Sequence, residues 1–143
     1  PGEGLKSMVK IASGGETSRL MLALKNVLAQ ADDIPTLIFD EIDQGIGGRV
    51  GTKVGEKLWH VARAHQVFCV THMPQLAAFG DQHFSVRKNI LNNRSITETE
   101  VLTGENRVFE LAGMLGSPGE SGLNSAREIL ASAQQYAAAS QNG

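Results

Sequence analysis

Residues 11–28 read IASGGETSRLMLALKNVL, a small polar turn that runs into an apolar helical pattern. Ser13 and Glu16 fit the capping box of a helix start. Gly14 and Gly15 are unusual there, because each glycine costs up to about 1 kcal/mol inside a helix, but glycine lets another group approach the backbone closely. Because the first amides of a helix are unpaired and partly positive, the turn is either an ordinary helix start or a site for a phosphate oxygen. The helix that follows is predicted from the spacing of Leu20, Ala23, Leu24, Val27 and Leu28.

Two short apolar segments further along the chain end in polar residues. Residues 36–39 (TLIF) predict a buried strand that runs into Asp40 and Glu41, and residues 66–71 (QVFCVT) predict a second buried strand that ends at His72. Ligands of open α/β sheets bind at the carboxyl ends of the strands. Since adjacent strand residues point opposite ways, one carboxylate can face a magnesium shell and the other a water. The simpler alternatives are a solvated turn for the carboxylates and a structural role for the histidine.

The order strand, helix, strand predicts a parallel α/β layer. The 143 residues suit one domain, 1–143, with residues 1–10 as a lead-in and a fraying tail from residue 137. After residue 44 the sequence predicts a glycine-rich loop over 45–48, then a helix with the apolar face Val50, Val54, Leu58 and Val61. One or two helical turns over 74–79 and a hairpin of 83–89 with 96–103 follow. Two further helices are separated by a break at 116–119: the first carries Val108, Leu111, Ala112 and Leu115, and the last carries Leu123, Ala126, Ile129, Leu130 and Ala133.

Composition excludes several classes of protein. The net charge of −2 and the pI of about 6.1 give no overall electrostatic footprint for nucleic acid or a membrane. Cys69 is the only cysteine, so no internal disulfide forms and a reducing, intracellular home is expected. No apolar run approaches the roughly 20 residues of a membrane span. The chain begins with Pro1 rather than Met, which is typical of a processed chain or a fragment.

The order of these features resembles that of ABC-type ATPases. In that comparison SGGE is similar to the signature motif, the apolar strand ending in Asp-Glu to the Walker B strand, and the histidine after the second strand to the switch histidine. DEID in place of DEP-Thr is similar to the SMC branch of that family, and in particular to its bacterial DNA-repair members. The resemblance covers roughly residues 2–130. It rests on PGEGLKSMVKIASGGETSRLMLALK, LIFDEIDQGIGGRVG, CVTHMPQLAAFGDQHFSVRK and ENRVFELAGML.

The resemblance implies a fold and a missing partner. The expected fold is the C-terminal lobe of an ATPase head, a mostly parallel sheet flanked by helices, with a β-hairpin and C-terminal helices. The Walker A pattern Gly-x-x-x-x-Gly-Lys-Ser/Thr occurs nowhere in the 143 residues. In the family it lies in an N-terminal lobe beyond a long coiled coil. This chain alone is therefore expected to be inactive, and the N-terminal Walker A lobe is its expected partner.

The resemblance also implies roles in ATP hydrolysis. Two heads close on two ATP molecules as a homodimer. Asp40 would hold Mg²⁺ through water, while Glu41 would polarise the attacking water and His72 would contact the γ-phosphate. The signature turn would bind the γ-phosphate held by the partner head; it consists of Ser13, Gly14, Gly15 and Glu16. The implied process is DNA double-strand break repair and recombination in the bacterial cytoplasm, at the nucleoid, with DNA bound through the full protein and no membrane.

One position departs from the family pattern. Many ABC ATPases have an aspartate at the end of the D-loop, and Gly47 occupies that position when counted from Asp40. Asp43 lies four residues earlier. The glycine-rich QGIGGR segment is therefore expected to take the cross-subunit role with backbone atoms.

Other interpretations remain open. A dinucleotide site at Gly45 and Gly47 would need Gly or Ala where Val50 stands. The four histidines and Cys69 lack compact metal-ligand spacing. The serious rivals are a non-catalytic dimerisation or interaction module and the head lobe of another SMC-like ATPase, such as the nuclease-associated kind. A basic spot is also visible, but three charges are more typical of a solvated face than of a DNA site; its residues are Arg87, Lys88 and Arg94.

Overall fold

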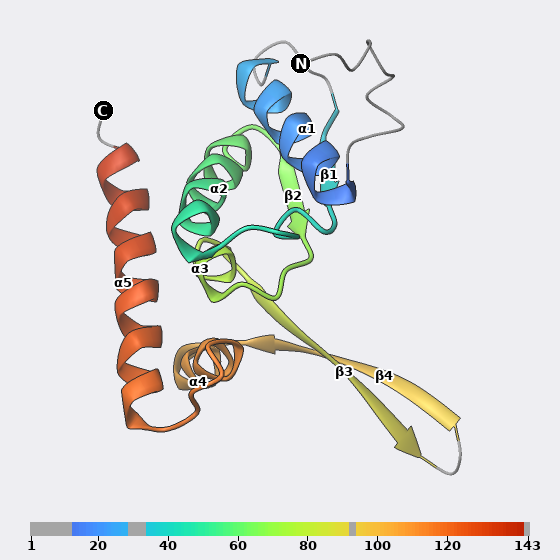
Figure 1. Ribbon diagram of the computed structural model, residues 1–143, viewed down its shortest axis with the longest axis vertical. Helices are drawn as coiled ribbons and strands as arrows, with labels where there is room; N and C mark the ends of the chain where they lie inside the picture. Colours follow the sequence, from blue (N-terminus) through green and yellow to red (C-terminus); the bar gives the residue numbers. More distant parts are fainter. Residues whose placement is uncertain (1–12, 29–33, 92–93, 142–143) are drawn as a thin grey trace, which may run out of the picture. The chain divides into compact units, whose positions relative to one another are not determined.

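The computed structural model describes residues 13–28, 34–91 and 94–141 (Figure 1). The predicted lead-in over residues 1–10 lies outside this part. The chain divides into two compact units, which are described separately: unit 1 extends to Leu76 and unit 2 begins at Ala77. The single domain expected from chain length stays a prediction.

Unit 1 contains the predicted strand–helix–strand layer. Its elements are α1 (Gly14–Leu28), β1 (Thr36–Phe39), α2 (Gly48–Val61) and β2 (Gln66–Cys69), followed by the short helix α3 (Pro74–Ala77) that crosses into unit 2. Strands β1 and β2 pair in parallel, with Thr36 opposite Gln66 and Phe39 opposite Cys69. The parallel pairing is therefore confirmed. Both strands end at the same edge of the sheet.

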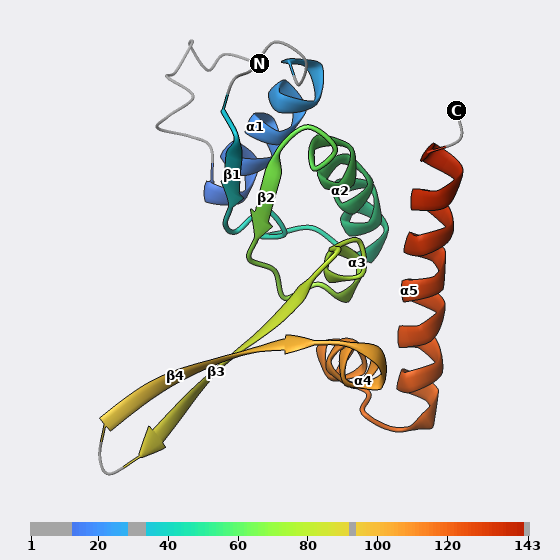
Figure 2. The ribbon, with the colours of Figure 1, turned by 180° about the vertical axis from the view of Figure 1, so that it is seen from behind.

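One face of the β1–β2 sheet is covered. Helices α1 and α2 pack against each other and against this face (Figures 1 and 2). The shared core consists of Leu22, Leu37, Phe39, Ile42, Val54, Leu58, Val61, Met73 and Leu76. This core places the loop after β1, which contains Ile42, directly over the helices.

The opposite face is open, so the prediction of fully buried strands was wrong for half of each strand. Ile38 is 73% exposed, and its neighbours Phe68 and Val70 are also exposed. The helical stripe was misjudged in the same way: Leu22 is buried at 3% exposure, whereas Val27 on the predicted stripe is 82% exposed. Among the described residues of unit 1, no element packs on this open sheet face. Apolar character alone predicted burial, but burial also requires a covering element.

Unit 2 contains the predicted hairpin and two helices. Strands β3 (His83–Leu91) and β4 (Arg94–Leu102) pair antiparallel as a hairpin separate from the β1–β2 sheet, with His83 opposite Leu102. Helices α4 (Gly104–Met114) and α5 (Glu120–Gln141) pack through an apolar cluster. That cluster contains Val108, Leu111, Ala112, Leu123 and Ala126.

The end of α5 differs from expectation. The tail was predicted to fray from residue 137, but the helix continues to Gln141. Alanine has the strongest helix propensity, and the run AAA at 137–139 supports the helix. Ala133 is also buried, and the Tyr136 ring lies 5.8 Å from the Phe79 ring. No helix in the described part of the chain is both long and apolar enough to cross a membrane.

Candidate functional site

The turn before α1 is a capping box, as predicted. The Ser13 amide donates a hydrogen bond to Glu16 Oε2 at 2.8 Å, and the Glu16 amide donates one to Ser13 Oγ at 3.3 Å. The bond from the Ser13 amide is the main reason why the pKa of Glu16 lies below its ordinary value. The Thr17 amide donates to the Ser13 carbonyl. Two of the first helical amides are thus satisfied inside the turn.

The glycines of this turn have a packing role that the sequence did not reveal. A Cβ on Gly14 would collide with the Glu41 carboxylate, and a Cβ on Gly15 would lie 2.8 Å from the Glu41 carbonyl and 3.0 Å from Gln44 Cβ. The close approach that glycine permits is therefore made by residues 41–44 of the same chain. In the described part of the chain, no acceptor takes a hydrogen bond from the Gly14 or Gly15 amide.

Side chains of α1 hold this turn against the loop after β1. Ser18 Oγ donates to the Asp40 carbonyl at 2.9 Å. One guanidinium nitrogen of Arg19, Nη1, donates to the carbonyls of Ile42 at 3.0 Å and Gln44 at 2.9 Å. These bonds span more than 20 residues of sequence, so local pattern did not show them. They bring SGGE and DEID together.

The two carboxylates after β1 are both exposed at the sheet edge. Asp40 Oδ1 accepts a hydrogen bond from the Glu41 amide at 2.9 Å. Glu41 has φ of 56°, a left-handed conformation that non-glycine residues rarely adopt. Strand geometry therefore stops at Phe39, and the alternation argument used to separate Asp40 from Glu41 does not apply. The Glu41 side chain instead lies against Gly14.

Asp43 joins this loop to the end of β2. Its side chain is only 3% exposed, and Oδ2 accepts from Thr71 Oγ at 2.5 Å and from the His72 amide at 2.9 Å. The Nδ1 atom of His72 lies 3.1 Å from the same oxygen, while the His72 side chain is 80% exposed. The predicted meeting of His72 with the loop after β1 thus occurs through Asp43, which was not among the predicted site residues. A carboxylate next to the buried Ile42 was the available signal.

Gly47 lies at the N-cap of α2 with φ of −102°, which any residue adopts. A Cβ there would meet no atom within 4 Å. Gly45 has φ of 74° and is the glycine that the backbone of this loop requires. Gly47 is exposed, but no contact in the described part of the chain gives it a role.

Cys69, the last residue of β2, is not a nucleophile. Burial, followed by the charges of Asp43 and Asp40, raises the pKa of its thiol to about 12. The thiol therefore stays protonated at neutral pH, and a protonated thiol is a poor nucleophile. The polar chemistry at this sheet edge belongs to oxygen and imidazole groups.

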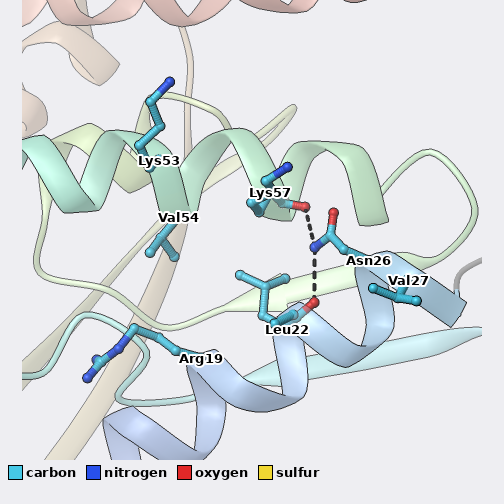
Figure 3. Close-up of a pocket in the computed structure, with 8 residues that line it drawn as sticks. Arg19, Leu22, Asn26, Val27, Lys53, Val54 and Lys57 are labelled. Atoms are coloured by element: carbon cyan, nitrogen blue, oxygen red, sulfur yellow. Dashed lines mark hydrogen bonds between the residues drawn. The ribbon is translucent and has the colours of Figure 1, made fainter.

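A hollow of about 380 Å³ lies between α1 and α2, away from the sheet edge (Figure 3). Asn26 Nδ2 bridges the two helices by donating to the carbonyls of Leu22 at 3.0 Å and Lys57 at 3.3 Å (Figure 3). Two of the three cations on its wall have partners elsewhere: Arg19 binds the loop after β1, and Lys53 pairs with Glu56 at 2.8 Å. This hollow contains none of the predicted site residues.

The predicted basic spot on the hairpin is divided. Arg87 pairs with Glu110 at 3.3 Å and stands opposite Glu98 in the ladder. Lys88 follows Arg87 along β3 and therefore points to the other face. The two charges do not form one patch for a phosphate backbone.

Comparison with known proteins places these features in context. No family model matches the chain. It is 40% identical over 136 residues to the DNA repair protein RecN of Bacillus subtilis, covering 94% of this chain and 24% of that protein. It is 44% identical over 132 residues to RecN of Deinococcus radiodurans, covering 92% of this chain and 23% of that protein. It is 47% identical over 130 residues to RecN of Mycobacterium leprae, covering 90% of this chain and 22% of that protein. The chain spans less than a quarter of the length of each of these relatives.

Proposed function

Because the chain belongs to the RecN family of DNA repair proteins, as a segment of less than a quarter of their length, we propose that it is the C-terminal lobe of an SMC-like ATPase head. Its proposed role is ATP-dependent head dimerisation and hydrolysis during DNA double-strand break repair and recombination, in the cytoplasm at the nucleoid. DNA is bound through the full protein. The observation that carries this proposal is the single hydrogen-bonded assembly of the SGGE turn, the Asp-Glu strand end and His72 at one sheet edge.

The residues at this edge suit Mg²⁺ and ATP. Exposed carboxylate oxygens are the ligands that Mg²⁺ prefers, usually through several waters, and Asp40 offers them directly after β1. The amides of Gly14 and Gly15 at the start of α1, which have no acceptor among the described residues, suit a phosphate oxygen. When bound, Mg-ATP supplies the phosphoryl group for hydrolysis. Asp40 would hold the magnesium shell, and the turn would bind the nucleotide of the partner head.

Glu41 and His72 would act on the nucleotide of their own head. Glu41 would orient and deprotonate the attacking water, and His72 would contact the γ-phosphate. In the chain by itself the Glu41 carboxylate lies against Gly14. The proposed role therefore includes a rotation of Glu41 toward the nucleotide when the Walker A lobe is present. Gly47 and the loop around it would face the partner head with backbone atoms.

The open sheet face supports a missing lobe. Ile38 and Phe68, which stand opposite each other in the ladder, and Val70 expose apolar surface on the open face of β1 and β2. Monomeric proteins rarely leave such a surface uncovered. We infer that the N-terminal Walker A lobe packs there. The same surface also supports the second candidate, a non-catalytic dimerisation or interaction module.

The test is ATP hydrolysis by this chain alone and with the Walker A lobe supplied in trans. No turnover alone and turnover on mixing are expected. Glu41→Gln should lower turnover by about 10²–10⁴-fold, because a general base is lost, and should trap ATP-bound dimers. Glu128→Gln, an exposed glutamate of α5, is the matched control and should leave turnover unchanged.

Three results would contradict the proposal. Normal turnover by Glu41→Gln would remove Glu41 from its role. No turnover by lobes that associate and bind ATP would favour the non-catalytic module. Turnover by the chain alone would show that the missing phosphate loop is not needed.

A further inference from the structure

We propose that Asp43 is a positioning residue that sets the orientation and the tautomer of His72. The functional consequence rests on the proposed ATPase function, whereas the geometric relation between the two side chains does not. No motif of the family resemblance assigned Asp43 a role, and the sequence analysis named it only as a residue displaced from the D-loop position.

The geometry begins with one oxygen atom. Asp43 Oδ2 accepts from Thr71 Oγ at 2.5 Å and from the His72 amide at 2.9 Å, and it lies 3.1 Å from His72 Nδ1. The Asp43 side chain is 3% exposed. A buried carboxylate costs free energy unless donors surround it. Its two hydrogen-bond donors and the nearby Nδ1 atom belong to two consecutive residues just after β2, so the carboxylate fixes that segment.

The chemistry of the pair determines which ring nitrogen carries hydrogen. An ionised carboxylate can only accept hydrogen bonds. The Nδ1 atom of His72 must therefore be the donor, and a neutral His72 presents the lone pair of Nε2 outward. Because the His72 side chain is 80% exposed, Nε2 is the atom available to a ligand at the sheet edge. The tautomer is set by the bond that the other nitrogen makes.

Thr71 strengthens this arrangement. Its hydroxyl donates to Asp43 and accepts from the Met73 amide at 3.0 Å. The amide of Ile46 donates to the Asp43 carbonyl at 3.3 Å. The backbone of Asp43 thus belongs to the loop after β1, while its side chain holds the turn after β2. A change in this loop would be transmitted to the His72 ring through a single side chain.

The first test is a double-mutant cycle in the complete protein. Asp43→Ala should lower kcat for ATP hydrolysis by about 10–100-fold, the usual effect of losing an orienting partner, with less than about threefold change in KM. Asp43→Asn retains an acceptor oxygen and should recover part of this loss. In a His72→Ala background the Asp43 substitutions should have no further effect, because they act through the ring. The same factor in both backgrounds would overturn the proposal.

The second test needs no turnover. In complete protein labelled with ¹⁵N-histidine, the ring signal lost in His72→Ala identifies His72. At pH 8 this signal should report hydrogen on Nδ1, and the Nδ1–H form should no longer be favoured in Asp43→Ala. An Nε2–H form in the unmodified protein would overturn the proposal even if a variant failed to fold. If His72→Ala leaves turnover unchanged, the proposed role of His72 fails, while the spectrum still decides whether Asp43 sets the ring.

Discussion

Asp43 in unit 1 and Arg107 in unit 2 each hold a turn through a single side-chain atom, but they serve different ends. Asp43 Oδ2 gathers donors from Thr71 and His72. Arg107 Nη2 donates to the carbonyls of Ala77 at 3.0 Å, Ala78 at 3.1 Å and Gly80 at 2.7 Å. Each is a charged side chain that fixes a turn far away in the sequence. Only Asp43 also has a partner that is an exposed ring.

The difference separates a structural contact from a site. The partners of Arg107 are backbone carbonyls at the end of α3, and they can do nothing but hold the chain. Burial lowers the pKa of Arg107, but an arginine stays charged in proteins. The group held by Asp43 ends in an exposed imidazole with a free nitrogen. Unit 1 therefore uses a buried charge to present chemistry, and unit 2 uses one to close a turn.

The largest expected effect concerns the capping box of Ser13 and Glu16. Its contacts are with backbone, as those of Arg107 are, but the proposed function makes it a phosphate-binding site. Ser13→Arg should abolish ATP-dependent head dimerisation in the complete protein, because a long side chain would fill the space of the partner's phosphate. ATP binding to one head should remain. Ser13→Ala is the control, since it removes only the cap, at a cost of about 1 kcal/mol in stability. Light scattering with and without ATP measures the dimer.

The two Ser13 variants decide what kind of contact the capping box is. If Ser13→Arg and Ser13→Ala formed dimers equally well, the capping box would have a purely structural role, as Arg107 does. Loss of dimers in both, together with unfolding of α1, would also remove the phosphate role. Only loss in Ser13→Arg with retention in Ser13→Ala supports a partner site.

A smaller effect is expected at Arg107. Arg107→Gln should lower the free energy of unfolding of unit 2 by about 1–3 kcal/mol, because the partly buried carbonyls lose their donor. Hydrogen exchange of α4 and β3 in the complete protein measures this loss. Arg127→Gln is the control, since Arg127 makes an exposed ion pair with Glu105 and such pairs contribute about 0–1 kcal/mol. If Arg107→Gln lost ATP affinity while the hydrogen exchange of α4 and β3 stayed the same, Arg107 would not be a purely structural contact.

Local sequence pattern predicted the elements of both units but not these long-range contacts. The capping box of Ser13 and Glu16 involves residues three apart, so its residue types alone indicate it. The bond from Thr71 to Asp43 spans 28 residues and depends on the β1–β2 register. Periodicity likewise found α1, but it could not tell that Leu22 faces the core while Val27 does not. Which face of a helix is buried depends on the elements that pack against it. This chain spans less than a quarter of the length of its relatives, so some of those elements can belong to the rest of the protein.

The smallest expected effect is a pH dependence at His83, which lies beside Arg107. Burial, followed by the charge of Arg107, lowers the pKa of His83 below its ordinary 6.5, while Glu110 opposes the shift. The folded chain therefore favours neutral His83. As pH falls below about 6.5, the unfolded chain takes up a proton that the folded chain does not, so stability decreases on acidification.

Protection factors of β3 amides between pH 7.5 and pH 5.5 measure this dependence after correction for the intrinsic exchange rate. His83→Gln should remove the acid sensitivity of unit 2, because glutamine does not titrate. His60→Gln, at an exposed histidine of unit 1, should leave it in place. Equal acid sensitivity in His83→Gln and in the unmodified chain would mean that another group titrates in unit 2. In that case the acid sensitivity of unit 2 would not report the burial of His83 beside Arg107.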